Sequence, residues 1–426
     1  MSVPLTYPSW SWLLSRLFEA GKALGPWSDT EIETLAVKIF TAMESPHREY
    51  HTLKHLTQFS PSDPTEILAV LFHDVVYLDV DGQWPESFAS LLDQPTAVPF
   101  YQELAHLFGF SQTRPLAISQ PTQGSPPPGR NEFFSAIAFA GTLGVQVGRT
   151  VTLEVAACIE ATIPFRGQSA LETLYQRLLD LGLDADAAVA RAVHLANQDV
   201  ESFQFDDPGN FLAGTWDLLP ELNPVLRLSP LFSIKNYRQA LERMEKFFFG
   251  LKADQLMLSW RGLPTTEELA AGRQRIENNL TTAGAYLDAK LLAAGLLEAL
   301  AVVSGGDVPI SLFMGAPGAE PSDRLEAKLP PLPPATEIDQ LTFLLEWGRS
   351  KSTGFDLTNS PLAAWLWRQM SPGARQTQRR KADDFFNEQI SADEFLHHWP
   401  ENLSRQVAQA VAALVPTRRT RLAPWL

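Results

Sequence analysis

The sequence has little cysteine and a deficit of positive charge. Cys158 is the only cysteine among the 426 residues, which excludes an internal disulfide and a thiolate metal cage. Lysine and arginine together number 34 against 49 aspartates and glutamates, so the formal net charge is −15. A chain this acidic is poorly suited to a broad nucleic-acid surface or to an anionic membrane.

Long apolar runs are also missing. No stretch of about 18 or more apolar residues occurs, so the sequence predicts no transmembrane helix. The N-terminal segment lacks the charged start, the apolar centre and the cleavage site of a signal peptide. We therefore expect a cytoplasmic protein with no membrane partner.

Helical periodicity dominates what is present, and alternating strand-like runs are scarce. The sequence therefore predicts an all-α fold, and at about 150 residues per domain its length indicates two or three domains. We expect a helical domain over 1–230, with a proline-rich insertion at about 111–130. A helical C-terminal region over 231–426 follows, with a loop or linker at about 315–335.

Histidines gather in one short part of the chain. Four of the eight lie between positions 47 and 73, and His51 and His55 are four apart, so they share a face of a helix. His73 and Asp74 follow directly on the apolar run 67–72. Clustered imidazoles and carboxylates beside apolar helices are typical of a divalent-metal site. Zincins have the same His-x-x-x-His spacing, but Thr52 stands where they need a catalytic glutamate.

The segments 48–55 (REYHTLKH) and 71–77 (LFHDVVY) resemble the HD superfamily of metal-dependent phosphohydrolases. The match is to the branch with an R-x-Y-H-x-x-x-H motif followed by F-H-D-x-x-Y. This resemblance implies a helical bundle whose four ligands follow the pattern H…HD…D. The ligands would be His55, His73, Asp74 and a later aspartate, best matched by Asp199, with Asp206 and Asp207 as rivals. The ion would be Mn, Fe, Mg, Ni, Co or Zn in divalent form.

The same resemblance suggests roles for the neighbouring residues. His51 corresponds to the histidine that protonates the leaving group in cyclic-nucleotide phosphodiesterases, and Glu86 to an acid that orients the attacking water. Arg48 and Arg166 are candidates for binding phosphate oxygens of the substrate. The family usually has histidines after the position of Thr162, whereas this chain has Ile-Pro-Phe.

The resemblance implies a metal-dependent hydrolase that acts on a nucleotide or another small phosphorylated molecule. The alternative is a non-catalytic metal- or nucleotide-binding regulatory protein whose C-terminal half binds a protein partner. A homo-oligomer is compatible with either hypothesis. His194 is expected to be a packed interior histidine, with a place near a second ion as the other interpretation.

Overall fold

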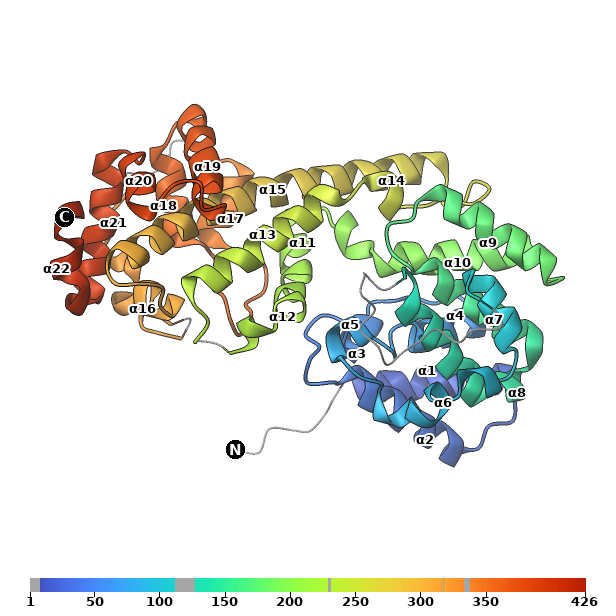
Figure 1. Cartoon of the computed structure of the whole chain (residues 1–426). Coiled ribbons are helices and arrows are strands. Elements are labelled where there is room, and N and C mark those ends of the chain that lie inside the picture. The colour runs from blue at the N-terminus through green and yellow to red at the C-terminus, as the bar shows by residue number, and fades with distance from the viewer. Residues whose placement is uncertain (1–7, 112–126, 229–230, 317, 333–337) are drawn as a thin grey trace. The chain divides into compact units, whose positions relative to one another are not determined.

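The computed structural model describes residues 8–111, 127–228, 231–316, 318–332 and 338–426, and these form helices and turns without a strand. The predicted all-α fold class is confirmed. The chain divides into two compact units (Figure 1). Unit 1 comprises Met1–Gln204 and Leu251–Ile276, and unit 2 comprises Phe205–Gly250 and Glu277–Leu426.

This division differs from the expected boundary at 230/231. The chain leaves unit 1 after residue 204 and returns to it at 251–276. The returning segment is held by Asn197, whose amide donates to the carbonyl of Leu258 (2.8 Å) and accepts from its N–H (2.9 Å). Leu258 and Trp260 are buried in the core of unit 1. These two apolar residues lie far along the sequence from the core that they complete, so no local pattern predicts the return.

Unit 1 contains most of the helices that surround the histidine motif. They are α1 (Pro8–Leu24), α2 (Asp29–Met43), α3 (Leu53–Leu56), α4 (Pro64–Phe72), α5 (Leu78–Asp81), η1 (Glu86–Phe88), α6 (Ala89–Leu92), η2 (Pro95–Ala97), α7 (Tyr101–Phe108), α8 (Arg130–Ala161), α9 (Gln168–Asp180), α10 (Ala185–Asp199), η3 (Glu201–Gln204) and α14 (Ala253–Leu256).

Unit 2 shares the long α15 (Thr266–Val303) with unit 1. Its own elements are α11 (Pro208–Trp216), α12 (Leu218–Leu222), η4 (Pro224–Arg227), α13 (Ile234–Gly250), α16 (Ile310–Met314), η5 (Pro321–Asp323), η6 (Leu325–Lys328), α17 (Gln340–Trp347), α18 (Pro361–Gln369), α19 (Pro372–Phe386), α20 (Ala392–His397), α21 (Glu401–Leu414), η7 (Pro416–Arg418), α22 (Arg419–Leu422) and η8 (Ala423–Trp425).

The helix α4 is the buried centre that positions the histidine motif. Asp63 caps its start by accepting a hydrogen bond from the N–H of Glu66, and Pro64 stands at the first helical position. Its residues 67–72 are each at most 1 % exposed. A helix that is apolar on every side is stable only when other helices surround it. In unit 1, α4 packs against α1, α8 and α10.

The helix α8 is interrupted at Gly148, whose φ of 79° and ψ of 169° lie outside the helical region. Glycine tolerates this conformation because it has no Cβ. Among the described residues, α8 alone is long and apolar enough to span a bilayer. However, half of its apolar window is buried within the protein, where α4, α7 and α10 pack against it (Figure 1). A core helix of a helical domain has these properties.

The described part of the predicted loop or linker at about 315–335 includes short helical turns. It contains η5 and η6, and η6 packs against α21. Leu325 is fully buried and Leu329 is 8 % exposed, so two leucines anchor a proline-rich segment to unit 2. Most of the predicted insertion, residues 112–126, lies outside the described residues, as do 317 and 333–335 of the linker.

Candidate metal centre

Three helix ends bring together the four predicted ligands. His55 lies in α3, His73 is the C-terminal cap of α4, and Asp74 follows it directly. Asp199 is the last residue of α10. Both α4 and α10 pack against α8 and against each other, so their ends converge at one point of unit 1. Asp74 and Asp199 are 125 residues apart in the sequence, yet both of their carboxylates lie near Nε2 of His55.

The potential ligand atoms are close together. The Nε2 of His55 lies 3.0 Å from Oδ1 of Asp199 and 4.0 Å from Oδ2 of Asp74. The Nε2 of His73 lies 3.0 Å from Oδ2 of Asp74 and 3.6 Å from Oδ1 of Asp199. Ligand atoms of His55, His73 and Asp199 all fall within 4.8 Å of one another. Both histidines are buried, at 4 % and 1 % exposed.

These separations fit binding to one ion. Two ligand atoms that each lie about 2.1 Å from a cation are about 3.0 Å apart at a right angle and about 3.4 Å apart in a tetrahedron. The four measured distances range from 3.0 to 4.0 Å, and this range includes both expected separations. With neutral imidazoles, the two carboxylates carry a charge that a divalent cation balances. The donor set therefore suits a divalent metal ion.

Unpartnered buried atoms support the same fit. The Nδ1 of His73 lies 2.9 Å from the carbonyl oxygen of Val70, and because a carbonyl only accepts, Nδ1 carries the proton. When the ring is neutral, Nε2 presents a lone pair toward the cluster, the arrangement usual for a metal-binding histidine. Nε2 of His73 and Oδ2 of Asp74 are buried without a hydrogen-bond partner among the described residues. A cation would satisfy both atoms at once.

The electrostatics of the cluster favour a positive charge at its centre. Burial alone would lower the pKa of His73, but the carboxylates of Asp74 and Asp199 raise it well above its usual value. Burial would raise the pKa of Asp74, yet the His73 imidazolium holds it far below its usual range. For Asp199, hydrogen bonds from His55 and His73 outweigh burial and lower the pKa to about 2. A metal ion would take the place of the proton on His73.

His51 lies beside this cluster. Its ring centroid is 5.9 Å from that of His55 and 4.4 Å from that of Tyr77, with both ring pairs edge to face. The charge of His51 also lowers the pKa of Asp74. His51 is therefore a neighbour of the group that could hold a metal, as a proton donor next to a metal centre would be.

Arg48 occupies a buried position next to the motif. Its Nε and NH2 donate to the carboxylate of Asp81 at 3.1 and 2.6 Å, and its NH1 donates to the carbonyl of Asp74 at 2.7 Å. The side chain of Arg48 is 0 % exposed. These contacts fix the backbone at Asp74 relative to α5. A substrate contact by Arg48 stays a prediction.

Arg166 lies at a small cavity beside the cluster. The cavity has a volume of about 20 Å³, and its wall includes Asp199, Arg166 and Ile163. Two nitrogens of Arg166 hold the buried carboxylate of Glu160 at 2.7 and 2.9 Å. The guanidinium is thus fixed with 28 % of the side chain exposed next to a candidate ligand. This position is compatible with the predicted phosphate contact.

The two candidate acids differ in their surroundings. Glu86 is exposed at the start of η1, and no contact described for this part of the chain joins it to the cluster. Glu132, in the first turn of α8, was not predicted. Burial, together with the negative charges of Asp74 and Asp199, raises its pKa to about 7 against the opposing effect of Arg166. In the sequence Glu132 is simply an acid at a helix start, so it carries no distinct signal.

The remaining candidates have structural contacts. His194 lies 3.0 Å from the buried carboxylate of Glu66, and Gln198 bonds to its other ring nitrogen. Its side chain is 45 % exposed, so it is not the packed interior residue that we expected. Asp207 caps α11 by accepting a hydrogen bond from the N–H of Gly209, and Asp206 is exposed. The cluster of possible ligands contains Asp199 and neither of these rivals.

Comparison of the chain with known protein families, with curated proteins and with solved structures found no match.

Proposed function

We propose that the chain is a metal-dependent phosphohydrolase that acts on a nucleotide or another small phosphoester. One observation carries the proposal. The residues that match the HD motif, His55, His73 and Asp74, converge with Asp199 at distances that suit one divalent ion. The motif and the geometry are independent of each other, because nothing in the spacing of the motif requires Asp199 to lie there.

The bound ion would activate water for attack at phosphorus and offset the charge of the phosphoryl oxygens. His55, His73, Asp74 and Asp199 would hold that ion. His51 would donate a proton to the leaving oxygen, since it adjoins His55 without belonging to the ligand set. Arg166, oriented by Glu160, would hold a phosphate oxygen at the cavity beside Asp199.

Glu132 is the stronger candidate for accepting a proton from water. A general base works best when its pKa is near the working pH, and burial brings the pKa of Glu132 to about 7. Glu86, the acid that the resemblance suggests, remains the other candidate. We expect the activity in the cytoplasm, where the small acidic chain would meet soluble phosphoesters.

Two measurements test the proposal. Metal analysis of the purified protein should find a bound divalent ion, and a panel of nucleotides and small phosphoesters should then be assayed with Mn²⁺, Mg²⁺, Fe²⁺, Co²⁺, Ni²⁺ and Zn²⁺. Turnover of at least one substrate that disappears in Asp74→Ala would support the proposal. The matched control is Asp93→Ala, which changes an exposed aspartate in the same unit.

Metal binding without turnover would instead favour the non-catalytic alternative. The small volume beside Asp199, about 20 Å³, and the engagement of Arg166 by Glu160 are the observations that favour it. In that case a nucleotide should still bind and raise the melting temperature, because a ligand that binds only the folded state stabilises it. Absence of any bound metal would reject the metal-dependent hydrolase and the metal-binding form of the alternative, and would leave only nucleotide binding.

A further inference from the structure

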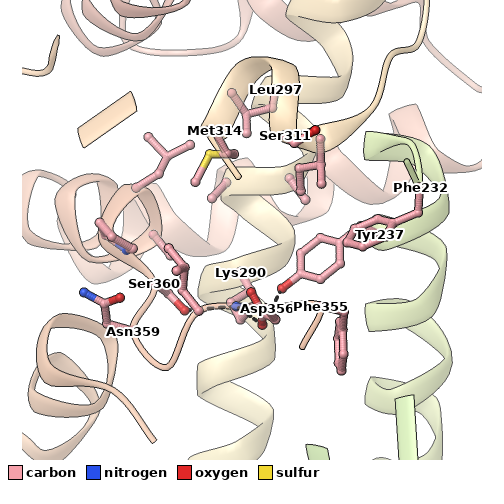
Figure 2. Close-up of a pocket in the computed structure, with 18 residues that line it drawn as sticks. Phe232, Tyr237, Lys290, Leu297, Ser311, Met314, Phe355, Asp356, Asn359 and Ser360 are labelled. Carbon is pink, nitrogen blue, oxygen red and sulfur yellow. Dashed lines mark hydrogen bonds and ion pairs between the residues drawn. The ribbon is translucent and has the colours of Figure 1, made fainter. Parts of the chain in front are cut away.

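Unit 2 contains a second cavity, separate from the metal centre. It has a volume of about 80 Å³ and lies among α13, α15, α16 and the start of α18. Figure 2 shows Lys290 and Asp356 on one side of it, and Leu297, Met314 and Ser311 on the other. The cavity therefore has an apolar side and a charged side.

The space arises from small residues on one stripe of α15. Lys290, Ala293, Ala294 and Leu297 line the cavity and follow the spacing i, i+3, i+4, i+7 of a single helix face. The two alanines leave room where larger side chains would fill the core. At the share of liquid volume that one water takes, about 30 Å³, a cavity of about 80 Å³ accommodates roughly two to three water-sized groups and therefore only a small ligand.

The charged side is a buried hydrogen-bonded cluster around Asp356. Its Oδ2 accepts from the hydroxyl of Tyr237 (2.9 Å), from Nε1 of Trp216 (3.0 Å) and from Nζ of Lys290 (3.1 Å). The ammonium of Lys290 also donates to Oγ of Ser360 at 3.0 Å. Burial would raise the pKa of Asp356, but Lys290 and Arg349 lower it below its usual value. The carboxylate is therefore ionised.

This cluster holds more positive than negative charge. Arg349 lies 3.5 Å from the same Oδ2 of Asp356, and its side chain is fully buried. Lys290 and Arg349 thus share one carboxylate. The Nε of Arg349 is buried without an acceptor among the described residues. Both cations also lie over the ring of Trp216, at 5.3 Å for Lys290 and 4.3 Å for Arg349, but a ring carries no net charge, so these groups together keep one positive charge in excess.

Donors also outnumber acceptors where the cluster meets the cavity. An ammonium has three N–H groups, and two of those on Lys290 are used by Asp356 and Ser360. Leu362 and Ala363 line the cavity in the first turn of α18, where backbone N–H groups have no acceptor within the helix. The charge and the hydrogen-bonding capacity therefore both call for an acceptor that carries negative charge.

We propose that unit 2 binds a small monocarboxylate with a short apolar body. Its carboxylate would lie at Lys290 and the start of α18, and its hydrocarbon part against Leu297 and Met314. Small-molecule sites commonly combine an apolar lining with a few polar groups that fix the orientation of the ligand. The proposal does not depend on the phosphohydrolase activity of unit 1.

Calorimetric titration of the full-length protein tests this assignment. The probes are butanoate and hexanoate, with butanamide and hexanamide as uncharged matches of the same shape. A hydrogen bond to a charged group predicts that each acid binds about tenfold or more tightly than its amide. Equal affinities, or no binding of either acid at millimolar concentration, would overturn the proposal.

Two substitutions on α15 locate the binding. Ala294→Leu replaces a methyl group in the cavity wall by an isobutyl group, so it should abolish acid binding while keeping an apolar residue in place. Val302→Leu changes an exposed position on the same helix and should leave binding unchanged. Acid binding that survives Ala294→Leu would show that the acids bind elsewhere, for example at the ion of unit 1, and would reject this site.

Discussion

The Nε2 of His73 and the Oδ2 of Asp74 lie 3.0 Å apart but form no hydrogen bond with each other. A nitrogen lone pair and a carboxylate oxygen repel at this distance unless a positive charge lies between them. The protein holds both atoms in place, since His73 is tied to the carbonyl of Val70 and the backbone of Asp74 to Arg48. The fold thus maintains an arrangement that either a proton on Nε2 of His73 or a metal ion between the two atoms makes favourable.

The first prediction concerns metal content. The purified protein should carry about one divalent ion per chain, because the candidate ligands form a single cluster. Asp74→Ala should lose the ion and become less stable by a few kcal/mol, since metal binding contributes folding energy. Elemental analysis and urea unfolding measure both effects. Metal at the wild-type level in Asp74→Ala would refute the assignment, and Asp93→Ala should match the wild type.

The second prediction separates a ligand from a proton donor. His55→Ala should lose metal, because its Nε2 lies 3.0 Å from Asp199 inside the cluster. His51→Ala should keep metal and lose activity by about 10²-fold, the usual size of a general-acid contribution. Metal content and kcat are measured on the same samples. Equal metal loss in the two variants would mean that His51 is a ligand.

The third prediction concerns Asp199. Asp199→Asn should weaken metal binding by about tenfold or more, because the amide carries no charge and its oxygen is a weaker ligand than a carboxylate. Asp206→Asn is the matched control, and as an exposed change it should alter affinity by less than about threefold. Titration with a metal indicator gives both affinities. Similar losses in the two variants would remove Asp199 from the ligand set.

Some of this arrangement could be predicted from the sequence. The capping box at Ser28 and Glu31 begins α2 at Asp29, where the polar residues indicate a helix start. The apolar run before His73 predicts a buried helix that ends at the His-Asp pair, and α4 is that helix. Local patterns of this kind are set by neighbours in sequence, so the sequence alone reveals them.

Other features depend on contacts between distant segments. Asn197 holds Leu258 by two hydrogen bonds, and this pairing moves the unit boundary away from position 230. Glu132 looks like an ordinary first-turn acid in the sequence, and only the fold makes it half-buried and exposes it to the charges of Asp74 and Asp199. The cavity at Lys290 requires four separate segments to meet. No periodicity or motif predicts these contacts between distant segments, because each segment alone has no distinctive sequence pattern.

The fourth prediction is the pH dependence that Glu132 causes in protein stripped of metal. Its pKa is about 7 in the folded protein and near 4.5 in the unfolded chain, so the folded state binds the extra proton between these values. Stability should therefore fall as the pH rises from about 4.5 to 7. Glu132→Gln should reduce this slope and be more stable than the parent at pH 8, as measured by urea unfolding. An unchanged slope would contradict the burial of this carboxyl group.

The fifth prediction tests whether Arg48 supports the fold of the site. Its guanidinium is the partner of the Asp81 carboxylate, whose side chain is only 7 % exposed. Arg48→Met should leave that carboxylate buried without its partner and lower the free energy of unfolding by about 3–5 kcal/mol. Urea unfolding of metal-free protein measures the change without interference from metal binding.

The surface pair of Arg16 and Glu19 provides the matched control for Arg48. Arg16 lies 2.8 Å from Glu19, with 31 % and 51 % of the two side chains exposed. Arg16→Met should therefore cost less than about 1 kcal/mol, the usual limit for an exposed ion pair. If Arg48 acted only on substrate, Arg48→Met would raise KM and leave unfolding as in Arg16→Met. A large loss of stability in Arg48→Met alone would instead show that Arg48 supports the fold around the site through its pair with Asp81.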